Sequence, residues 1–396
     1  MSNETVPYWP VGTTTEESLP LSMADIARYL LEDWFPSVPV PVSQAWQMSW
    51  AEMLIESTTS ESLPNPQWSM AAHTTGMERQ WKGFVSWMLG VVGTRRVLDE
   101  EGYQWIAPAS AFYSKRKAPV TLNKWYHGYP QCALTVKSSG SSTKLRPDYL
   151  CARPAENPEW HPELAFVESK GTLKALANRQ ICPSSWREQA QNGLVEFRGV
   201  PCDVARHLVV ATRVNPNAKR PMTRRLKIRA WNSEAPVRPP NPGVVLEVAR
   251  AHYAGILRNI GLLQSELALK SAAAVISRPA SLKKKEHEAL VRRANEEIAE
   301  KLSEPDDTND YGPLRHVPEI LTDQGKVRVS LHAKCIRMIE ILWGNPKHLP
   351  EQIRPFLFLD QALELEHLLN KSLAREEPAT SISRSGVIVR YERRKT

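Results

Sequence analysis

Apolar residues recur with a helical period in several parts of this 396-residue chain. In residues 74–93 the apolar side chains fall on one stripe, and a similar periodicity is present in 23–35 and 42–57. Beyond the middle of the chain, the same pattern predicts helices over 244–276, 281–304, 330–344 and 360–373. Stretches that are rich in proline separate several of these segments, as expected where regular structure is interrupted.

The middle of the chain changes to short apolar runs with turn residues between them. This pattern is typical of strands and predicts them over 131–139, 145–152, 163–171, 205–214 and 224–232. A helix is expected between the third and fourth of these strands, over residues 184–199. Its apolar stripe is Trp186, Ala190, Leu194 and Phe197. The order helix, three strands, helix, strand predicts an α/β unit.

The breaks in the pattern suggest three regions, a number that the chain length allows. We expect an N-terminal helical arm over 1–70, with residues 1–20 irregular, and an α/β domain over 71–235. A proline-rich linker over 233–243 leads to a C-terminal helical domain over 244–396.

Composition narrows the class of protein. The 42% of hydrophobic residues is enough for globular cores, so a disordered chain is excluded. The net charge of +8 favours a polyanionic partner. The five cysteines are widely spaced without a zinc pattern, which indicates reduced thiols. No signal peptide or apolar run of membrane-spanning length is found, and a cytoplasmic location is expected.

One of the predicted strands carries charged residues in an otherwise apolar run. In "LAFVESKGT" (164–172), Glu168 and Lys170 share one face, because side chains alternate along a strand. Upstream, "KLRPDYL" (144–150) places Asp148 at the start of another predicted strand. If the two strands pair as an antiparallel hairpin, Asp148 and Glu168 meet at the same end of the sheet.

Two adjacent carboxylates repel each other, and each raises the pKa of the other. A divalent cation relieves this repulsion, and Mg²⁺ prefers oxygen ligands. A nearby ammonium can stabilise charge or take a proton from a metal-bound water. A pair of carboxylates with a lysine is therefore suited to hydrolysing a phosphodiester.

The pair of segments "RPDYL" and "LAFVESKGT" resembles the PD-(D/E)xK nuclease superfamily, the restriction-endonuclease-like phosphodiesterases. The resemblance covers about residues 74–232. It implies a restriction-endonuclease-like core, with a mixed central sheet flanked by helices in the order helix, three-stranded meander, helix, strand. It also implies Mg²⁺ (or Mn²⁺) as cofactor, with Asp148, Glu168 and the backbone carbonyl of Ser169 as ligands, and Lys170 as the residue that orients or activates the attacking water.

Two more positions match polar residues that members of this superfamily often carry. Glu78 lies on the helix before the meander, at the edge of its apolar stripe. Gln189 follows the lysine on the next helix and is expected to reach the end of the sheet, whereas Gln191 is expected to face water. An exposed helix glutamate without a role is the alternative for Glu78.

The function expected from this resemblance is metal-dependent hydrolysis of nucleic acid, with DNA favoured over RNA. Nucleases of this superfamily often belong to bacterial restriction or antiphage systems, so a role in restriction or antiphage defence is suggested. A basic run over 213–229 could neutralise phosphates, or could be a solvated loop and edge strand. An unregulated nuclease would be toxic, so a protein partner or a homo-oligomer is also expected.

Two alternatives remain open from the sequence. The charged pair could be a salt bridge between Glu168 and Lys170 on a surface hairpin. The chain could also be a catalytically inert nuclease-like module that binds DNA or serves as a scaffolding subunit of a larger complex.

Overall fold

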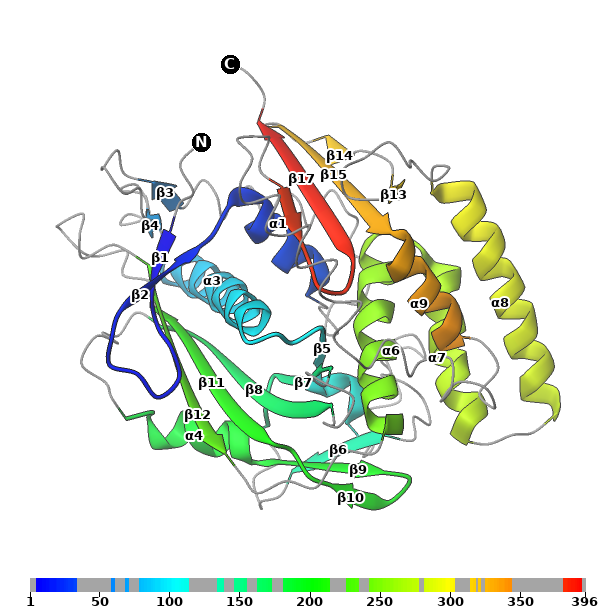
Figure 1. Ribbon diagram of the computed structural model, residues 1–396, viewed down its shortest axis with the longest axis horizontal. Helices are drawn as coiled ribbons and strands as arrows, with labels where there is room; N and C mark the ends of the chain where they lie inside the picture. The colour runs from blue at the N-terminus through cyan, green and yellow to red at the C-terminus, as the bar shows by residue number, and fades with distance from the viewer. Residues whose placement is uncertain are drawn as a thin grey trace.

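The structure, a computed structural model, is a mixed α/β protein organised around a seven-stranded sheet (Figure 1). It describes residues 5–33, 58–60, 68–70, 78–113, 134–138, 146–154, 162–172, 181–213, 226–234, 242–277, 281–302, 314–317, 320–321, 325–343 and 380–393. The helices predicted over 42–57 and 360–373 lie outside these residues, as do Cys132 and most of the basic run.

The central sheet has the strand order β2-β1-β12-β11-β8-β7-β5. Its strands are β1 (Thr5–Trp9), β2 (Glu17–Pro20), β5 (Trp105–Pro108), β7 (Tyr149–Arg153), β8 (Glu163–Thr172), β11 (Arg206–Arg213) and β12 (Lys227–Glu234). The strands β5, β7 and β8 form an antiparallel meander. The next strand, β11, runs parallel to β8, whereas β12 is antiparallel to β11. A parallel neighbour requires a crossover connection, and a helix lies in that connection here.

Two helices cover opposite faces of this sheet, α3 (Arg79–Glu100) and α4 (Ser184–Gln191) (Figure 1). Because successive side chains of a strand point to opposite faces, β8 contributes to both sides. Ala165 and Val167 lie in the hydrophobic cluster that contains α3. Glu168 and Lys170 therefore lie on the α4 face, where Ala190 of α4 is buried against β11.

Glycines allow α3 to approach β8 closely. A Cβ atom placed on Gly171 would lie 1.8 Å from the backbone oxygen of Ser86, and one on Gly90 would lie 2.6 Å from the nitrogen of Gly171. These contacts are backbone to backbone, so no side chain can move aside. The glycines thus fix α3 against the strand that carries Glu168 and Lys170.

Substituting alanine for Gly171 is expected to destabilise the protein by about 2–4 kcal/mol, because overpacking against a fixed backbone forces the helix away from the sheet. Thermal unfolding would measure the effect. Gly83→Ala is the matched control, since nothing lies within 4 Å of a Cβ at this position of α3. Equal melting temperatures for Gly171→Ala and the unmodified protein would contradict this packing.

The predicted strand and helix order is confirmed in part. The run 131–139 does contain a strand, β6 (Leu134–Ser138), but it pairs in a separate small sheet with β9 (Gly193–Phe197) and β10 (Val200–Cys202). The first strand of the meander is instead β5. The helix expected over 184–199 instead ends at Gln191, and the chain continues as β9. Gly193, the first residue of β9, lies against Phe166, where a Cβ would come 2.5 Å from a ring carbon.

The N-terminal region differs from the irregular arm that we predicted. Residues of 1–20 form β1 and β2, and β1 pairs in parallel with β12 at the edge of the central sheet. The expected helix follows as α1 (Met23–Glu32), with a capping box between Ser22 and Asp25. A further pair of strands, β3 (Thr58–Ser60) and β4 (Trp68–Met70), is antiparallel. A 3₁₀ turn, η2 (Ala109–Phe112), follows β5.

The C-terminal region contains a sheet as well as helices, so its prediction as a helical domain is wrong. The helices are α6 (Pro242–Asn259), α7 (Leu263–Ser277), α8 (Ser281–Lys301) and α9 (Ala333–Trp343). Gly261, at φ +82°, separates the first two, which we predicted as one helix. The strands are β13 (Leu314–His316), β14 (Ile320–Leu321), β15 (Gly325–His332), β16 (Thr380–Ile382) and β17 (Val387–Arg393). None of the described helices combines the length and apolar character that crossing a bilayer requires.

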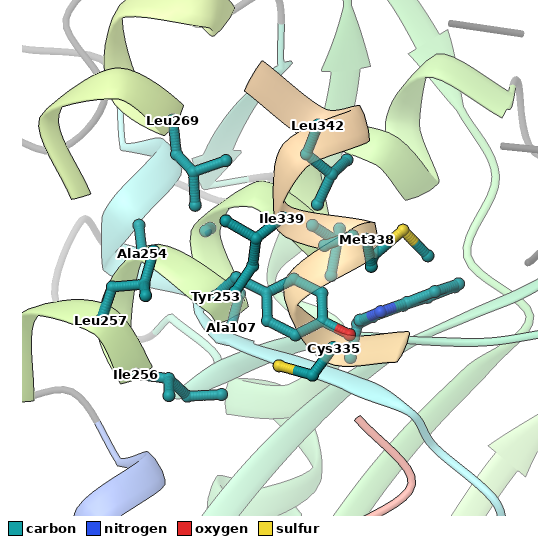
Figure 2. Close-up of a cluster of buried hydrophobic side chains, with 14 of the residues drawn as sticks. Ala107, Tyr253, Ala254, Ile256, Leu257, Leu269, Cys335, Met338, Ile339 and Leu342 are labelled. Atoms are coloured by element: carbon teal, nitrogen blue, oxygen red, sulfur yellow. The ribbon is translucent and has the colours of Figure 1, made fainter. Parts of the chain in front are cut away.

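One hydrophobic cluster joins the C-terminal region to the central sheet. Figure 2 shows Ile339 and Leu342 of α9 close to Ala254 of α6 and Leu269 of α7, with Ala107 of β5 nearby. The α1 helix lies beside β17 (Figure 1), and the Arg28 guanidinium donates a hydrogen bond, 2.6 Å long, to Ser381 Oγ of the neighbouring strand β16. The three predicted regions therefore share a core in the described part of the chain.

Candidate active site

Asp148 and Glu168 meet where β7 begins, beside the middle of β8 in the central sheet. The antiparallel register of β7 and β8 pairs Tyr149 with Val167, so one step further places Asp148 opposite Glu168. The Asp148 backbone N–H donates to the Val167 carbonyl at 3.0 Å. Its side chain turns toward the next strand residue, where Oδ2 accepts a hydrogen bond from the Ser169 N–H at 2.8 Å. The predicted hairpin geometry is confirmed.

Glu168 is a carboxylate in the interior of the protein. Its exposed fraction is 0%, and apart from an ion pair to Lys170 neither of its oxygens accepts a well-formed hydrogen bond from a described residue. Burial, together with the nearby charge of Asp148, raises the pKa of Glu168 to about 8. A buried carboxylate with so few hydrogen bonds is costly in its ionised form, so a cation at this position would stabilise it.

Asp148 occupies a different environment. Its side chain is exposed at the start of β7. The protein behind it still removes part of its hydration and raises its pKa to about 6, although the Ser169 N–H and the charge of Lys170 act in the opposite direction. Because water reaches the open side of Asp148, this carboxylate ionises more readily than Glu168.

Lys170 is held between two acceptors. Its Nζ forms an ion pair with Glu168 Oε1 and donates to Gln189 Oε1 at 2.9 Å. Gln189 reaches down from α4, as the sequence predicted. The salt bridge expected under the first alternative is thus present, but its carboxylate is buried in a central strand rather than on a surface hairpin. Lys170 itself is only partly buried.

The backbone and the side chain of Ser169 make hydrogen bonds with different parts of the protein. Its N–H donates to Asp148 on the site side, whereas Thr94 Oγ1 of α3 donates to Ser169 Oγ at 2.9 Å. This second hydrogen bond helps to fix the strand between the two candidate ligands.

Two residues that lie beside Asp148, Tyr113 and Arg146, were not predicted from the sequence. Tyr113, which follows η2, donates from its hydroxyl to the Pro147 carbonyl at 3.0 Å. The guanidinium of Arg146 lies 4.3 Å from the centre of the Tyr113 ring, and its buried Nε has no hydrogen-bond partner among the described residues. Arg146 directly precedes the Pro147–Asp148 pair, which could have drawn attention to it. Nothing local marks Tyr113, because only the fold brings it to this site.

Two other positions lie away from the carboxylates. Glu78 is exposed at the N-cap of α3 and makes no capping hydrogen bond with its side chain. It precedes Ser86, the residue in contact with Gly171, by about 12 Å along the helix axis. The structure therefore does not bring Glu78 to Asp148 and Glu168. Gln191 donates to Ser233 Oγ at 3.0 Å, on β12.

The oxygen atoms at this site suit a hard divalent cation. Asp148, Glu168 and the Ser169 backbone carbonyl would supply only oxygen ligands, the set that Mg²⁺ prefers. Across the described residues, no group of three or more histidine, cysteine, aspartate and glutamate side chains comes together. The two carboxylates alone are consistent with Mg²⁺, which usually keeps several waters. None of the four described cysteines forms a disulfide.

Comparison of the chain with models of known families, with curated proteins and with solved structures finds no match.

Proposed function

We propose that this protein is a metal-dependent nuclease that hydrolyses DNA phosphodiester bonds with Asp148, Glu168 and Lys170. The observation that carries the proposal is the juxtaposition of these three residues in the central sheet, where the pKa of Glu168 is raised to about 8. Strongly perturbed carboxylates beside an amine are typical of functional sites.

The order of elements supports the proposal independently of the motif. A helix, α3, precedes the meander of β5, β7 and β8; a second helix, α4, follows; and β11 then pairs in parallel with β8. This order agrees with the restriction-endonuclease-like core that the motif suggested, with helices on both faces of a mixed sheet.

The proposed chemistry assigns a task to each side chain. Asp148, Glu168 and the Ser169 carbonyl would hold Mg²⁺, which when bound lowers the pKa of a coordinated water and neutralises phosphate charge. Lys170, whose ammonium is paired with Glu168, orients the attacking water and stabilises the negative charge that develops on it. The water oxygen forms a bond to phosphorus while the bond from phosphorus to the leaving oxygen breaks. The proton that the water loses passes to solvent, and the leaving oxygen takes up a proton from solvent. Gln189 fixes the position of the Lys170 amine.

A supercoiled plasmid assay tests this proposal. The full-length protein is expected to nick or linearise plasmid in Mg²⁺ and to leave it intact in EDTA. Asp148→Ala is expected to lose the activity while it keeps its fold, because this side chain is exposed. Cutting that persists equally in EDTA, or in the Asp148→Ala protein, would rule the proposal out.

A second candidate function is an inert nuclease-like module that binds DNA or acts as a scaffold. The ion pair between Lys170 and Glu168 favours it, since this contact balances the charge of the carboxylate without a metal. The plasmid assay separates the two functions, because an inert module binds DNA without cutting it in any divalent cation.

A further inference from the structure

Three cations extend from Lys170 along the same face of the sheet. The register pairs Lys170 with Ala211, and Ala211 with Arg229. Two residues further along each strand, and therefore on the same face, Arg213 of β11 pairs with Lys227 of β12. Neighbouring strands are about 4.8 Å apart, so the Arg229 backbone lies about 10 Å from that of Lys170. We call Arg213, Lys227 and Arg229 the basic edge.

Among the residues that the structure describes, the side chains of the basic edge have no acidic partners. None of the three forms an ion pair or a side-chain hydrogen bond with any part of the chain that the structure describes. Two of them lie near aromatic rings: the Arg229 guanidinium is 5.7 Å from the Trp231 ring centre, and Lys227 Nζ is 5.2 Å from that of Trp9.

Arg229 is the most unusual of the three. It is only 5% exposed, and burial alone lowers the pKa of its guanidinium. A buried cation without a counter-charge is unfavourable unless a ligand supplies one. In addition, the Nε of Arg213 is buried and has no hydrogen-bond partner among the described residues. This nitrogen therefore has unused capacity to bind an anion.

The α4 helix contacts the sheet beside Lys170, Trp231 and Ser233. Gln189 contacts Lys170, Trp186 lies against Trp231, and Gln191 contacts Ser233. Arg213, the last residue of β11, and Lys227, the first of β12, lie beyond these contacts, and both are partly exposed.

We infer that the basic edge binds the phosphate backbone of the DNA substrate and leads it to Asp148, Glu168 and Lys170. This inference rests on the proposed nuclease function for its choice of DNA. The unpaired cations continue the line of Lys170 along one edge, so a bound strand would pass from them directly to the candidate active site. Arginine is suited to such contacts because its planar guanidinium can donate two parallel hydrogen bonds to a phosphate.

Equilibrium binding tests the inference without any cleavage. Fluorescence anisotropy of a labelled duplex of about 30 base pairs is measured in EDTA at several salt concentrations, because each neutralised phosphate adds about 0.9 to the slope of log K against log[salt]. The double variant Arg213→Gln with Lys227→Gln is expected to reduce this slope by about 2. Arg229→Gln is expected to reduce it by about 1.

Arg337→Gln is the matched control, since Arg337 is an exposed arginine of α9. It should leave the slope unchanged. The double variant avoids the buried Arg229, so the test survives even if Arg229→Gln fails to fold. A folded double variant with an unchanged slope, or a full-length protein without salt-dependent duplex binding, would overturn the inference.

The two proposals fail in different ways. If the unmodified protein cleaves plasmid, and the double variant shows the same slope of log K against log[salt] as the unmodified protein, then the inference about the basic edge is wrong and the nuclease proposal remains. A reduced slope with no cleavage by the unmodified protein would support the basic edge and overturn the nuclease.

Discussion

Replacing Lys170 with methionine is expected to slow Mg²⁺-dependent plasmid cleavage by about 10²–10³-fold, the usual cost of removing one preorganised hydrogen-bond donor from an active site. Methionine keeps most of the length and apolar volume of the side chain but removes the amine that contacts Gln189 and Glu168. Single-turnover cleavage of a supercoiled plasmid would measure the effect on the chemical step.

The fold should survive this substitution at neutral pH. With the amine gone, Glu168 can take up a proton, because burial and the charge of Asp148 already raise its pKa to about 8. Gln191→Ala is the control on the neighbouring helix, since Gln191 contacts Ser233 rather than Lys170. If the Lys170→Met protein cut as fast as the unmodified protein, the amine would have only a structural role.

Replacing Glu168 with glutamine is expected to stabilise the metal-free protein at alkaline pH. The pKa of Glu168 is higher in the folded protein, at about 8, than its ordinary value of 4.5. Between these two values the folded state binds more protons than the unfolded state, so the free energy of unfolding falls as the pH rises. Glutamine cannot ionise and avoids this loss, which is on the order of a few kcal/mol for such a shift.

Thermal unfolding in EDTA, followed across the range from about pH 5 to about pH 9, measures this effect. The two proteins should be closest in stability at the acidic end and diverge as the pH rises. Glu340→Gln, at a partly exposed position of α9, should follow the pH profile of the unmodified protein. Parallel profiles for Glu168→Gln and the unmodified protein would show that Glu168 is ionised without cost beside Lys170.

The candidate site was predictable because its signals are local. Glu168 and Lys170 interrupt an apolar run, and alternation along a strand assigns them to one face without any knowledge of the fold. If the strand that follows Asp148 pairs antiparallel with this strand, Asp148 must lie at the end where Glu168 and Lys170 are found. The position of Gln189 followed from helical periodicity in the same way.

Features that depend on distant partners were not predictable. The strand β5 has only four residues, and its place in the meander depends on pairing with β7. The strand β1 joins the sheet through β12, more than two hundred residues away in the sequence. The helix expected over 330–344 began too early, because Val327, Val329 and Leu331 alternate in a strand, β15, before α9 starts at Ala333.

Metal binding by the two carboxylates tests the central claim most directly. Isothermal titration of the full-length protein with Mn²⁺ or Mg²⁺ at a pH above 8 should give a single saturable site. Asp148→Asn and Glu168→Gln should each abolish it, whereas Lys170→Met should retain it. Undiminished binding by both carboxylate variants would place any metal elsewhere and would contradict the account.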